Sequence, residues 1–266
     1  MKRKQLFEFE DFDWFPASLR LTMTKLIVVL HKIIGTPHIL SELLIELKES
    51  KNFDQIVDLG SGSGGPMPLV TKALNEKTNE KIKLLLTDIN PHVKHALKVN
   101  STNDDLIRYR EQSLDAAHLD HVPEGLKTMI CSFHHMPPDT ARKILKSAQD
   151  NRQSILIYEI AANDYPFLVW LCFLPLSIPI LILMAILFLP FTQPFKAQDI
   201  LFTWLIPLVP IFFAWDGQAS LPRTYSFEDI KNELLPHESS DYVWKINYTY
   251  DARGRKAGYY IMGHVK

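Results

Sequence analysis

The sequence predicts an α/β protein with a doubly wound, mostly parallel seven-stranded sheet, a C-terminal antiparallel hairpin and a hydrophobic, membrane-associated helical insertion. Three observations lead to this fold class. Short apolar runs alternate with helical stretches from residue 53 to residue 160. Residues 242–265 instead form two long strand patterns around a turn. Between these parts, residues 165–215 carry charge only at Lys196 and Asp199.

Length and composition narrow the function classes. The 266 residues suit one domain with an insertion. A net charge of −1 provides no basic surface for nucleic acid, so we expect no nucleic-acid partner. Cys131 and Cys172 both lie in apolar runs without a partner at metal-ligand spacing. We therefore expect neither a disulfide framework nor a metal site.

Two N-terminal helices are expected first, and alternating strands and helices after them form the expected core. Helices are expected at 16–34 and 37–48, where Pro16 and Pro37 can each begin one. Apolar strands alternating with helices indicate a parallel sheet covered on both faces. The expected strands are 56–59, 83–87, 107–111, 128–133 and 154–160, and the expected helices between them are 66–75, 91–100 and 138–150.

The C-terminal part departs from this alternation. Residues 242–250 and 257–265 read as two strands joined by a turn, which predicts a β-hairpin. A short helix at 225–235 precedes it, with Ser226 and Asp229 placed as a capping pair. The expected domains are N-terminal helices at 1–50, a core formed by 51–164 and 216–266, and the insertion at 165–215.

A glycine loop follows the first strand, in the string IVDLGSGSGG at 56–65. Gly60, Gly62 and Gly64 allow sharp turns and a close approach of the backbone to a ligand. The same string satisfies G-x-G-x-x-G through Gly60, Gly62 and Gly65, so the loop alone fits either a dinucleotide or another nucleoside cofactor.

Three acids near the strand ends narrow the choice. Asp58 precedes the loop, where a carboxylate would repel the pyrophosphate of a dinucleotide. Asp88 ends the second strand, where it can accept hydrogen bonds from ribose hydroxyls, and Asp115 lies in the Ser113–Ala116 segment after the third strand. With the hairpin, this ordered set resembles the class I S-adenosylmethionine-dependent methyltransferases.

The resemblance implies S-adenosylmethionine as the cofactor. It places Asp58 near the ammonium group of the cofactor, Asp88 at the ribose and Asp115 at the adenine amino group. The expected cofactor-binding residues are Asp58, Gly60, Ser61, Gly62, Gly64, Asp88, Ile89, Asp115 and Ala116.

The methyl acceptor is expected above the carboxyl ends of strands four and five. Strand four ends in Ser132-Phe-His-His-Met136, so His134 and His135 are candidate proton acceptors, because histidine titrates near neutral pH. Glu159, at the end of strand five, is the third catalytic candidate. Methyl transfer can also proceed by orientation alone, so the general base stays open among these residues and none.

The insertion predicts membrane attachment. Residues 165–195 carry no charge and would extend about 45 Å as one helix, against a bilayer core of about 30 Å. The strands before the insertion and the hairpin after it belong to one sheet, so the chain must enter and leave the membrane on the same side. Two membrane crossings, or two re-entrant segments within one leaflet, meet this requirement. Pro175 and Pro179 favour the re-entrant form.

Polar and aromatic side chains follow the insertion in the string WDGQASLPRTY at 215–225. Asp216, Arg223 and Tyr225 are therefore candidates for binding a polar headgroup, or alternatively for anchoring the insertion at the membrane surface. The glycine loop, the Phe-His-His end of strand four, the insertion and this segment together resemble a group of bacterial methyltransferase-like membrane proteins. Leu221-Pro-Arg-Thr-Tyr departs from that pattern by an inserted proline.

The function expected from these features is methyl transfer from S-adenosylmethionine to a hydrophobic or lipid-like acceptor at the bilayer. We expect a membrane-associated protein whose catalytic core faces the cytoplasm. The alternatives are a nicotinamide-dependent oxidoreductase and a non-catalytic membrane adaptor that keeps the fold. The oxidoreductase would lack a Tyr-x-x-x-Lys pair near strand four or five, and Asp58 disfavours it.

Overall fold

A computed structural model describes residues 2–102, 104–237 and 239–266. Its internal contacts divide the chain into two compact units. The sheet unit contains Ile34–Ile160 and Ile230–Lys266, and the helical unit contains Met1–Ile33 and Ala161–Asp229. The domain boundaries expected at 50, 164 and 215 stay a prediction. The two units meet at other residues, because the first helix packs with the insertion.

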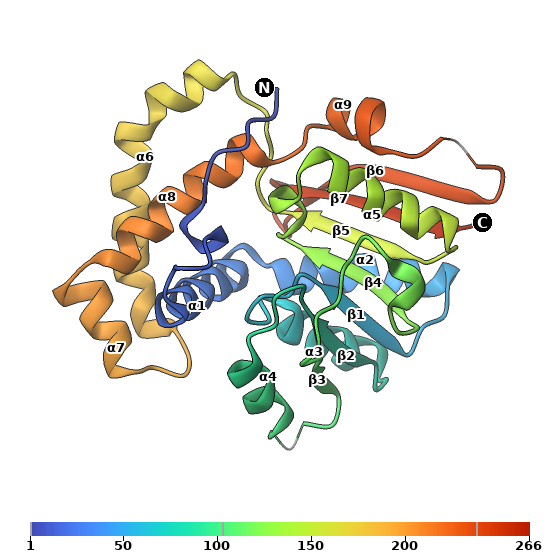
Figure 1. The fold of residues 1–266 in the computed structure, drawn as a ribbon, viewed down its shortest axis with the longest axis horizontal. Helices are drawn as coiled ribbons and strands as arrows, with labels where there is room; N and C mark the ends of the chain where they lie inside the picture. The colour runs from blue at the N-terminus through green and yellow to red at the C-terminus, as the bar shows by residue number, and fades with distance from the viewer. Residues whose placement is uncertain (1, 103, 238) are drawn as a thin grey trace. The chain divides into compact units, whose positions relative to one another are not determined.

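The sheet unit has a seven-stranded sheet within the described residues, in the order β3-β2-β1-β4-β5-β7-β6 (Figure 1). The first five strands are parallel, and β7 runs antiparallel to both β5 and β6. The predicted fold class is thereby confirmed, including its C-terminal antiparallel hairpin, whose second strand lies beside the fifth strand. The strands are β1 Gln55–Leu59, β2 Lys83–Thr87, β3 Ile107–Tyr109, β4 Leu126–Ile130, β5 Ile155–Glu159, β6 Tyr242–Tyr250 and β7 Lys256–Val265.

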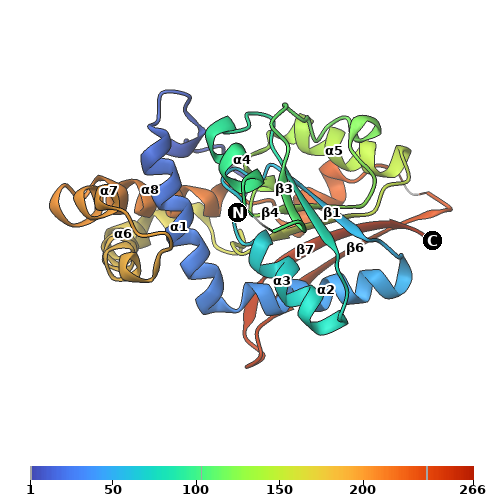
Figure 2. The same cartoon turned by 90° about the horizontal axis from the view of Figure 1, so that it is seen from below.

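Helices cover both faces of this sheet, with α2 and α3 on one face and α5 on the other (Figure 2). The apolar side chains of α2 and α3 form one core with alternate residues of the strands, among them Ile56, Leu84 and Leu126. The intervening residues face α5, which buries Ala141, Ile144, Leu145 and Ala148. The helices are α2 Thr36–Ser50, α3 Met67–Thr78, α4 Val93–Asn100 and α5 Pro138–Asp150.

Several predicted elements are shorter than expected, among them the third strand, which ends at Tyr109 and not at residue 111. The fourth strand ends at Ile130 and not at residue 133, because Cys131 adopts a positive φ of 54° and turns the chain into the 3₁₀ turn Phe133–His135. The helix expected at 225–235 is the short α9 Phe227–Asp229 followed by a π turn, Ile230–Leu234. Its predicted cap is confirmed, since Ser226 Oγ accepts from the Asp229 amide at 3.1 Å and the Asp229 carboxylate accepts from Ser226.

The helical unit is formed by the N-terminal helix and the insertion. Phe15, Leu19, Met23 and Leu26 of the N-terminal helix form one buried cluster with Ala185, Val209 and Phe213 of the insertion. The helices are α1 Ala17–Ile34, α6 Phe167–Phe188, α7 Ala197–Ile200 and α8 Leu208–Arg223, with the π turn Leu201–Leu205 before α8. The first helix is therefore packed as part of the apolar unit.

A buried ion pair joins α1 to α7. Lys25 Nζ lies 2.6 Å from Asp199 Oδ2, and both side chains are almost fully buried. Thr22 donates a hydrogen bond of 2.7 Å to the other carboxylate oxygen of Asp199. Lys25 also donates to the carbonyl of Pro194. These bonds satisfy the charges that the surrounding apolar residues cannot solvate.

The two prolines expected to interrupt the first part of the insertion lie inside one continuous helix. Pro175 and Pro179 are both within α6. The span Phe167–Phe191 is long and apolar enough to cross a membrane. Two bent helix pairs, α1 with α2 and residues 197–205 with α8, are long and apolar enough only if each pair is counted as one span. Those pairs bend by 72° and 76°. The re-entrant form was favoured because of the prolines, and this reason does not hold for α6.

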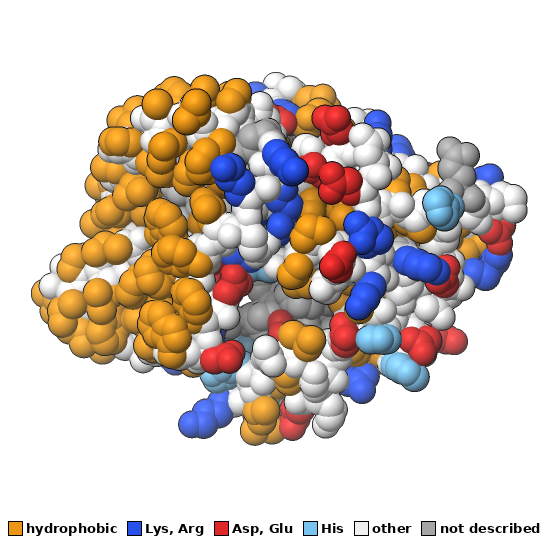
Figure 3. Space-filling model, turned by 45° about the horizontal axis from the view of Figure 1, so that its top comes forward, with side chains coloured by type: hydrophobic (Ala, Val, Ile, Leu, Met, Phe, Trp, Pro, Cys, Tyr) orange, Lys and Arg blue, Asp and Glu red, His pale blue; other side chains and the backbone are white. Residues whose placement is uncertain are grey.

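The surface of the helical unit is strongly apolar (Figure 3). Leu168 is 72% exposed and Leu176 is 60% exposed, although both are large apolar side chains. Further exposed residues of this kind are Leu171, Phe173, Ile180, Leu183, Leu187, Phe191, Trp204, Leu205, Ile206 and Ile211. We call these twelve residues the apolar face.

Candidate functional site

The glycine loop lies between β1 and α3, at the carboxyl edge of the sheet. Gly60, Gly62 and Gly64 have φ values of 66°, 53° and 99°, which other residues adopt at a cost. A Cβ atom at Gly60 would contact the Ser132 side chain at 3.4 Å, whereas a Cβ at Gly62 would have no protein atom within 4 Å. The backbone at Gly62 therefore faces open space that a ligand can occupy.

Asp58 lies beneath this loop, with 3% of its surface exposed. Its carboxylate accepts hydrogen bonds from Ser61 Oγ at 2.6 Å and from Thr128 Oγ1 at 2.7 Å. Burial raises the pKa of Asp58 from the usual 3.8 to about 7, although the two hydroxyl donors oppose this shift. Asp58 and Ser61 are thus brought together as expected, and Thr128 is a partner that the sequence did not indicate.

Asp88 follows β2 and connects it to the glycine loop. One of its carboxylate oxygens accepts from the Gly62 amide at 2.8 Å, and the other accepts from the Asn90 amide at 2.8 Å. The next residue, Ile89, is 54% exposed. The hydroxyl of Tyr109 donates to the Gly62 carbonyl at 2.6 Å, so both polar groups of this glycine are held by neighbouring strand ends.

Sequence reasoning missed the role of Tyr109. Burial and the nearby carboxylates of Asp88 and Asp58 raise the pKa of Tyr109, so its hydroxyl remains a donor at neutral pH. The signal that could have indicated it is its place at the end of the third strand. In a parallel sheet, the carboxyl ends of neighbouring strands meet at the same edge.

The segment after β3 is tied to the same edge by backbone contacts. The Leu114 amide donates to the Asp88 carbonyl at 3.0 Å, and Ser113 Oγ donates to the Ile89 carbonyl at 2.7 Å. The Asp115 carboxylate accepts from the Ala117 amide at 2.8 Å and lies 3.0 Å from His118 Nδ1. The expected cofactor segments therefore converge, while Asp115 is engaged by its own loop.

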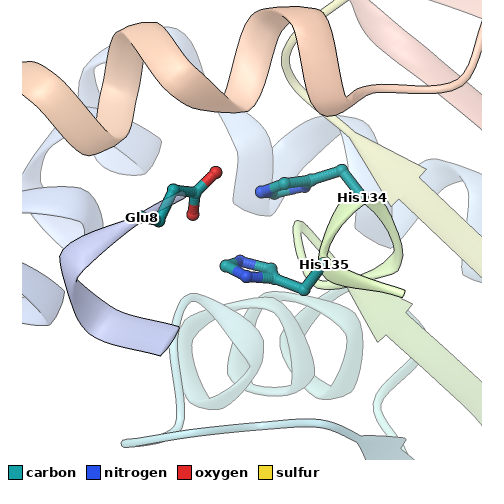
Figure 4. Close-up of side chains that lie close together, drawn as sticks. All are labelled: Glu8, His134 and His135. Carbon is teal, nitrogen blue, oxygen red and sulfur yellow. The ribbon is translucent and has the colours of Figure 1, made fainter. Parts of the chain in front are cut away.

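His134 and Glu159 form a buried pair at the ends of β4 and β5. Both Glu159 oxygens contact His134, one accepting its backbone N–H at 3.0 Å and the other lying 2.8 Å from its Nδ1. Glu159 is 1% exposed. The His135 ring lies beside the His134 ring, with centroids 4.3 Å apart and a 35° interplanar angle (Figure 4). The structure thus brings together all three catalytic candidates.

The three candidates for headgroup binding belong to the helical unit and are not exposed in it, and their role in binding a headgroup stays a prediction. Asp216, Arg223 and Tyr225 are buried, and α8 continues to Arg223. The Asp216 carboxylate accepts from the amides of Phe9 and Glu10 at 2.7 and 3.2 Å. Their burial follows because the N-terminal segment lies along α8, which the sequence pattern could not indicate.

The remaining contacts of this group are also with the N-terminal segment. Arg223 forms ion pairs with Glu8 at 3.3 Å and with Asp11 at 2.5 Å. The Arg3 guanidinium lies 4.3 Å from the centre of the Tyr225 ring. The side chain of Glu8 is labelled in Figure 4. In the structure, these side chains hold the N-terminus of the chain to the helical unit.

Comparison with known proteins bears on the fold. No protein-family model matches the chain, and no curated protein matches its sequence. The plantazolicin methyltransferase BpumL in complex with SAH superposes with a TM-score of 0.51 at 10% identity, over 94% of this chain and 97% of that chain. The methyltransferase domain of bacterial CtHen1 gives a TM-score of 0.46 at 12% identity, over 89% and 99% of the two chains. The mitomycin 7-O-methyltransferase MmcR gives 0.43 at 13% identity, over 80% and 49%.

These findings define the class of fold. The strand order, the antiparallel β7 and the likeness to BpumL together identify the fold of the class I S-adenosylmethionine-dependent methyltransferases. The sheet unit contains the glycine loop, Asp58 and Asp88 at the edge where open α/β sheets bind their ligands.

Proposed function

We propose that this protein transfers a methyl group from S-adenosylmethionine to an amphipathic acceptor at a membrane. The geometry at Gly62 supports the choice of S-adenosylmethionine as the methyl donor. Its amide is bonded to Asp88, its carbonyl to Tyr109, and the space above its Cα is open. A backbone held this rigidly with no side chain above it suits close contact with a nucleoside cofactor.

The residues present fit this cofactor by their chemistry. When bound, S-adenosylmethionine supplies an electrophilic methyl group on a sulfonium. By the resemblance to the family, Asp58 and Ser61 would hold the amino-acid end of the cofactor, and the buried Asp58 carboxylate suits an ammonium group. Asp88 would accept from the ribose hydroxyls, and Asp115 from the adenine amino group. Ile89 and Ala116 complete the set beside these two acids.

The acceptor would meet the His134–His135–Glu159 group at the ends of β4 and β5. A neutral imidazole can accept the proton that a hydroxyl or amine of the acceptor loses as it is methylated. Glu159 orients the His134 ring through Nδ1. Orientation of the acceptor supplies the rest of the rate enhancement.

The apolar face supports the membrane part of the proposal. Large exposed apolar patches mark protein or membrane contacts. Here the patch follows α6, and the 25-residue span Phe167–Phe191 that begins with this helix is long enough for a bilayer core. An acceptor with an apolar body could then reach the enzyme without leaving the lipid. The orientation with the sheet unit in the cytoplasm is part of this proposal.

Titration of the detergent-solubilised protein with S-adenosylhomocysteine, and in parallel with NADH, tests the cofactor. We expect binding of S-adenosylhomocysteine and none of NADH. Binding of NADH alone would replace the proposal with a nicotinamide-dependent oxidoreductase. Failure of both to bind would favour the non-catalytic adaptor.

Liposome flotation tests the membrane part. Replacing Leu176, Leu183 and Leu187 with glutamate should release the protein from vesicles, because these exposed side chains make up part of the apolar face. The matched control is glutamate at Val93 and Leu97, which are 49% and 52% exposed on α4 of the sheet unit. Equal flotation of both variants would contradict the assignment of the face to lipid.

A further inference from the structure

We propose that His134 and His135 bind a divalent transition-metal ion at the carboxyl end of β4, with Glu159 as the positioning residue. This inference departs from the expectation, drawn from cysteine spacing, that the chain has no metal site. Binding of the ion does not depend on the cofactor, whereas its part in catalysis rests on the proposed function.

The first observation is the arrangement of the two rings. The imidazoles lie side by side with centroids 4.3 Å apart. One nitrogen of each ring lies within 4.8 Å of a nitrogen of the other. Two nitrogens bound to one tetrahedral zinc at 2.0–2.1 Å are about 3.3 Å apart, so small side-chain rotations would bring both into ligand distance.

The second observation is the bond from His134 to Glu159. A carboxylate at Nδ1, here at 2.8 Å, favours the tautomer with hydrogen on Nδ1, in which Nε2 is the acceptor nitrogen of the ring. Histidines that bind metals commonly donate their other ring N–H to a carboxylate in this way. Glu159 is therefore placed as the carboxylate that orients a metal-binding histidine.

Charge balance supports the same assignment. Glu159 is 1% exposed, and its oxygens contact the backbone N–H and Nδ1 of His134. A buried carboxylate is costly unless a positive charge or strong donors compensate for it. A cation on Nε2 of His134 would provide that charge through the ring.

The backbone before the histidines is strained, as is common at functional sites. Cys131 has a φ of 54°, a left-handed conformation that residues with a side chain rarely adopt. This turn ends β4 and allows the 3₁₀ turn Phe133–His135 to place both histidines at the sheet edge. A continued strand would instead point the two neighbouring side chains to opposite faces.

The donor set indicates the kind of ion. Imidazole suits zinc, iron, nickel and copper better than magnesium or calcium, which prefer oxygen ligands. Two protein ligands leave coordination positions for water or for an oxygen of the acceptor. An acceptor hydroxyl bound there would release its proton to bulk water more readily, because the ion would lower its pKa, and His134 and His135 would then serve as ligands in place of proton acceptors.

Metal titration of the full chain tests the site. Detergent-solubilised protein is stripped with EDTA, exchanged into chelator-free buffer and titrated with Zn²⁺ by calorimetry and with Co²⁺ by visible absorption. We expect one ion per chain, with a Co²⁺ spectrum typical of nitrogen ligands. His135→Ala should remove most of this binding, and Glu159→Gln should weaken it roughly 10- to 100-fold.

The controls separate this site from general metal binding and from misfolding. His121→Ala is the matched control, because this histidine is exposed beside Asp120, and it should bind Zn²⁺ as the unmodified protein does. His135 is only partly buried, so its replacement should leave thermal unfolding nearly unchanged. Unaltered Zn²⁺ affinity in a folded His135→Ala variant would overturn the proposal, as would the absence of one-to-one binding in the unmodified protein.

A parallel titration with S-adenosylhomocysteine distinguishes the two proposals. Loss of metal binding in His135→Ala with unchanged S-adenosylhomocysteine affinity is the expected result. S-adenosylhomocysteine binding without any metal binding would leave the cofactor proposal standing and refute the metal site. Metal binding without S-adenosylhomocysteine binding would support the metal site and refute the cofactor proposal.

Discussion

Replacing Asp58 with asparagine should change how the stability of the protein depends on pH. Burial raises the pKa of Asp58 from 3.8 to about 7, so between these values the folded protein holds a proton that the unfolded chain has released. Stability therefore falls as pH rises through this window and is level above about pH 7. The shift of about three pKa units corresponds to about 4 kcal/mol over the whole window, and to about 3 kcal/mol between pH 5 and pH 8.

Asparagine fits the same position without the charge. Its carbonyl can accept from Thr128, and its amide can donate to Ser61 Oγ, as the protonated carboxyl of Asp58 would. The variant should therefore gain stability relative to the unmodified protein as pH rises, by about 3 kcal/mol between pH 5 and pH 8. Other titrating groups are common to both proteins and cancel in the difference.

Urea unfolding in mild detergent, followed by tryptophan fluorescence at pH 5 and pH 8, measures this difference. Asp54→Asn is the control, because Asp54 is exposed just before β1 and should show no pH-dependent difference. A difference between Asp58→Asn and the unmodified protein that is equal at both pH values would refute the reasoning. It would mean that Asp58 is ionised at low cost throughout this range.

Three further substitutions test other features. Gly62→Leu should abolish S-adenosylhomocysteine binding in calorimetry while costing about 1–2 kcal/mol in stability, because φ is positive but the space is open; retained binding would contradict the loop assignment. Gly258→Ala should destabilise the protein by about 3 kcal/mol or more in thermal unfolding, since its Cβ would lie 2.3 Å from the Glu159 carbonyl oxygen; a normal melting temperature would show that β7 can shift. Lys25→Met should cost about 3–5 kcal/mol by leaving Asp199 buried and unpaired, and adding Asp199→Leu should recover most of this loss; no recovery would mean that packing, and not charge, explains the cost.

The sequence alone determined the sheet and the loop of this protein. Apolar runs of strand length, separated by helical stretches, allow little besides a parallel sheet, and the order of the strands along the chain follows from the sequence. Because parallel strands end at one edge, Gly62 and Asp88 had to lie close together, and the hydrogen bond between them confirms this. Local patterns were sufficient here because, in a parallel sheet, residues that follow successive strands lie at the same edge.

Contacts between distant segments were decided only by the tertiary structure. Arg223 and Asp216 are separated by about two hundred residues from Asp11 and Phe9, their partners in the N-terminal segment, and no local pattern encodes that pairing. The sequence likewise marked Glu159 and His134 as neighbours at one edge without revealing that they bond. Side-chain hydrogen bonds depend on tenths of an ångström in how the strand ends turn, which packing determines and periodicity does not.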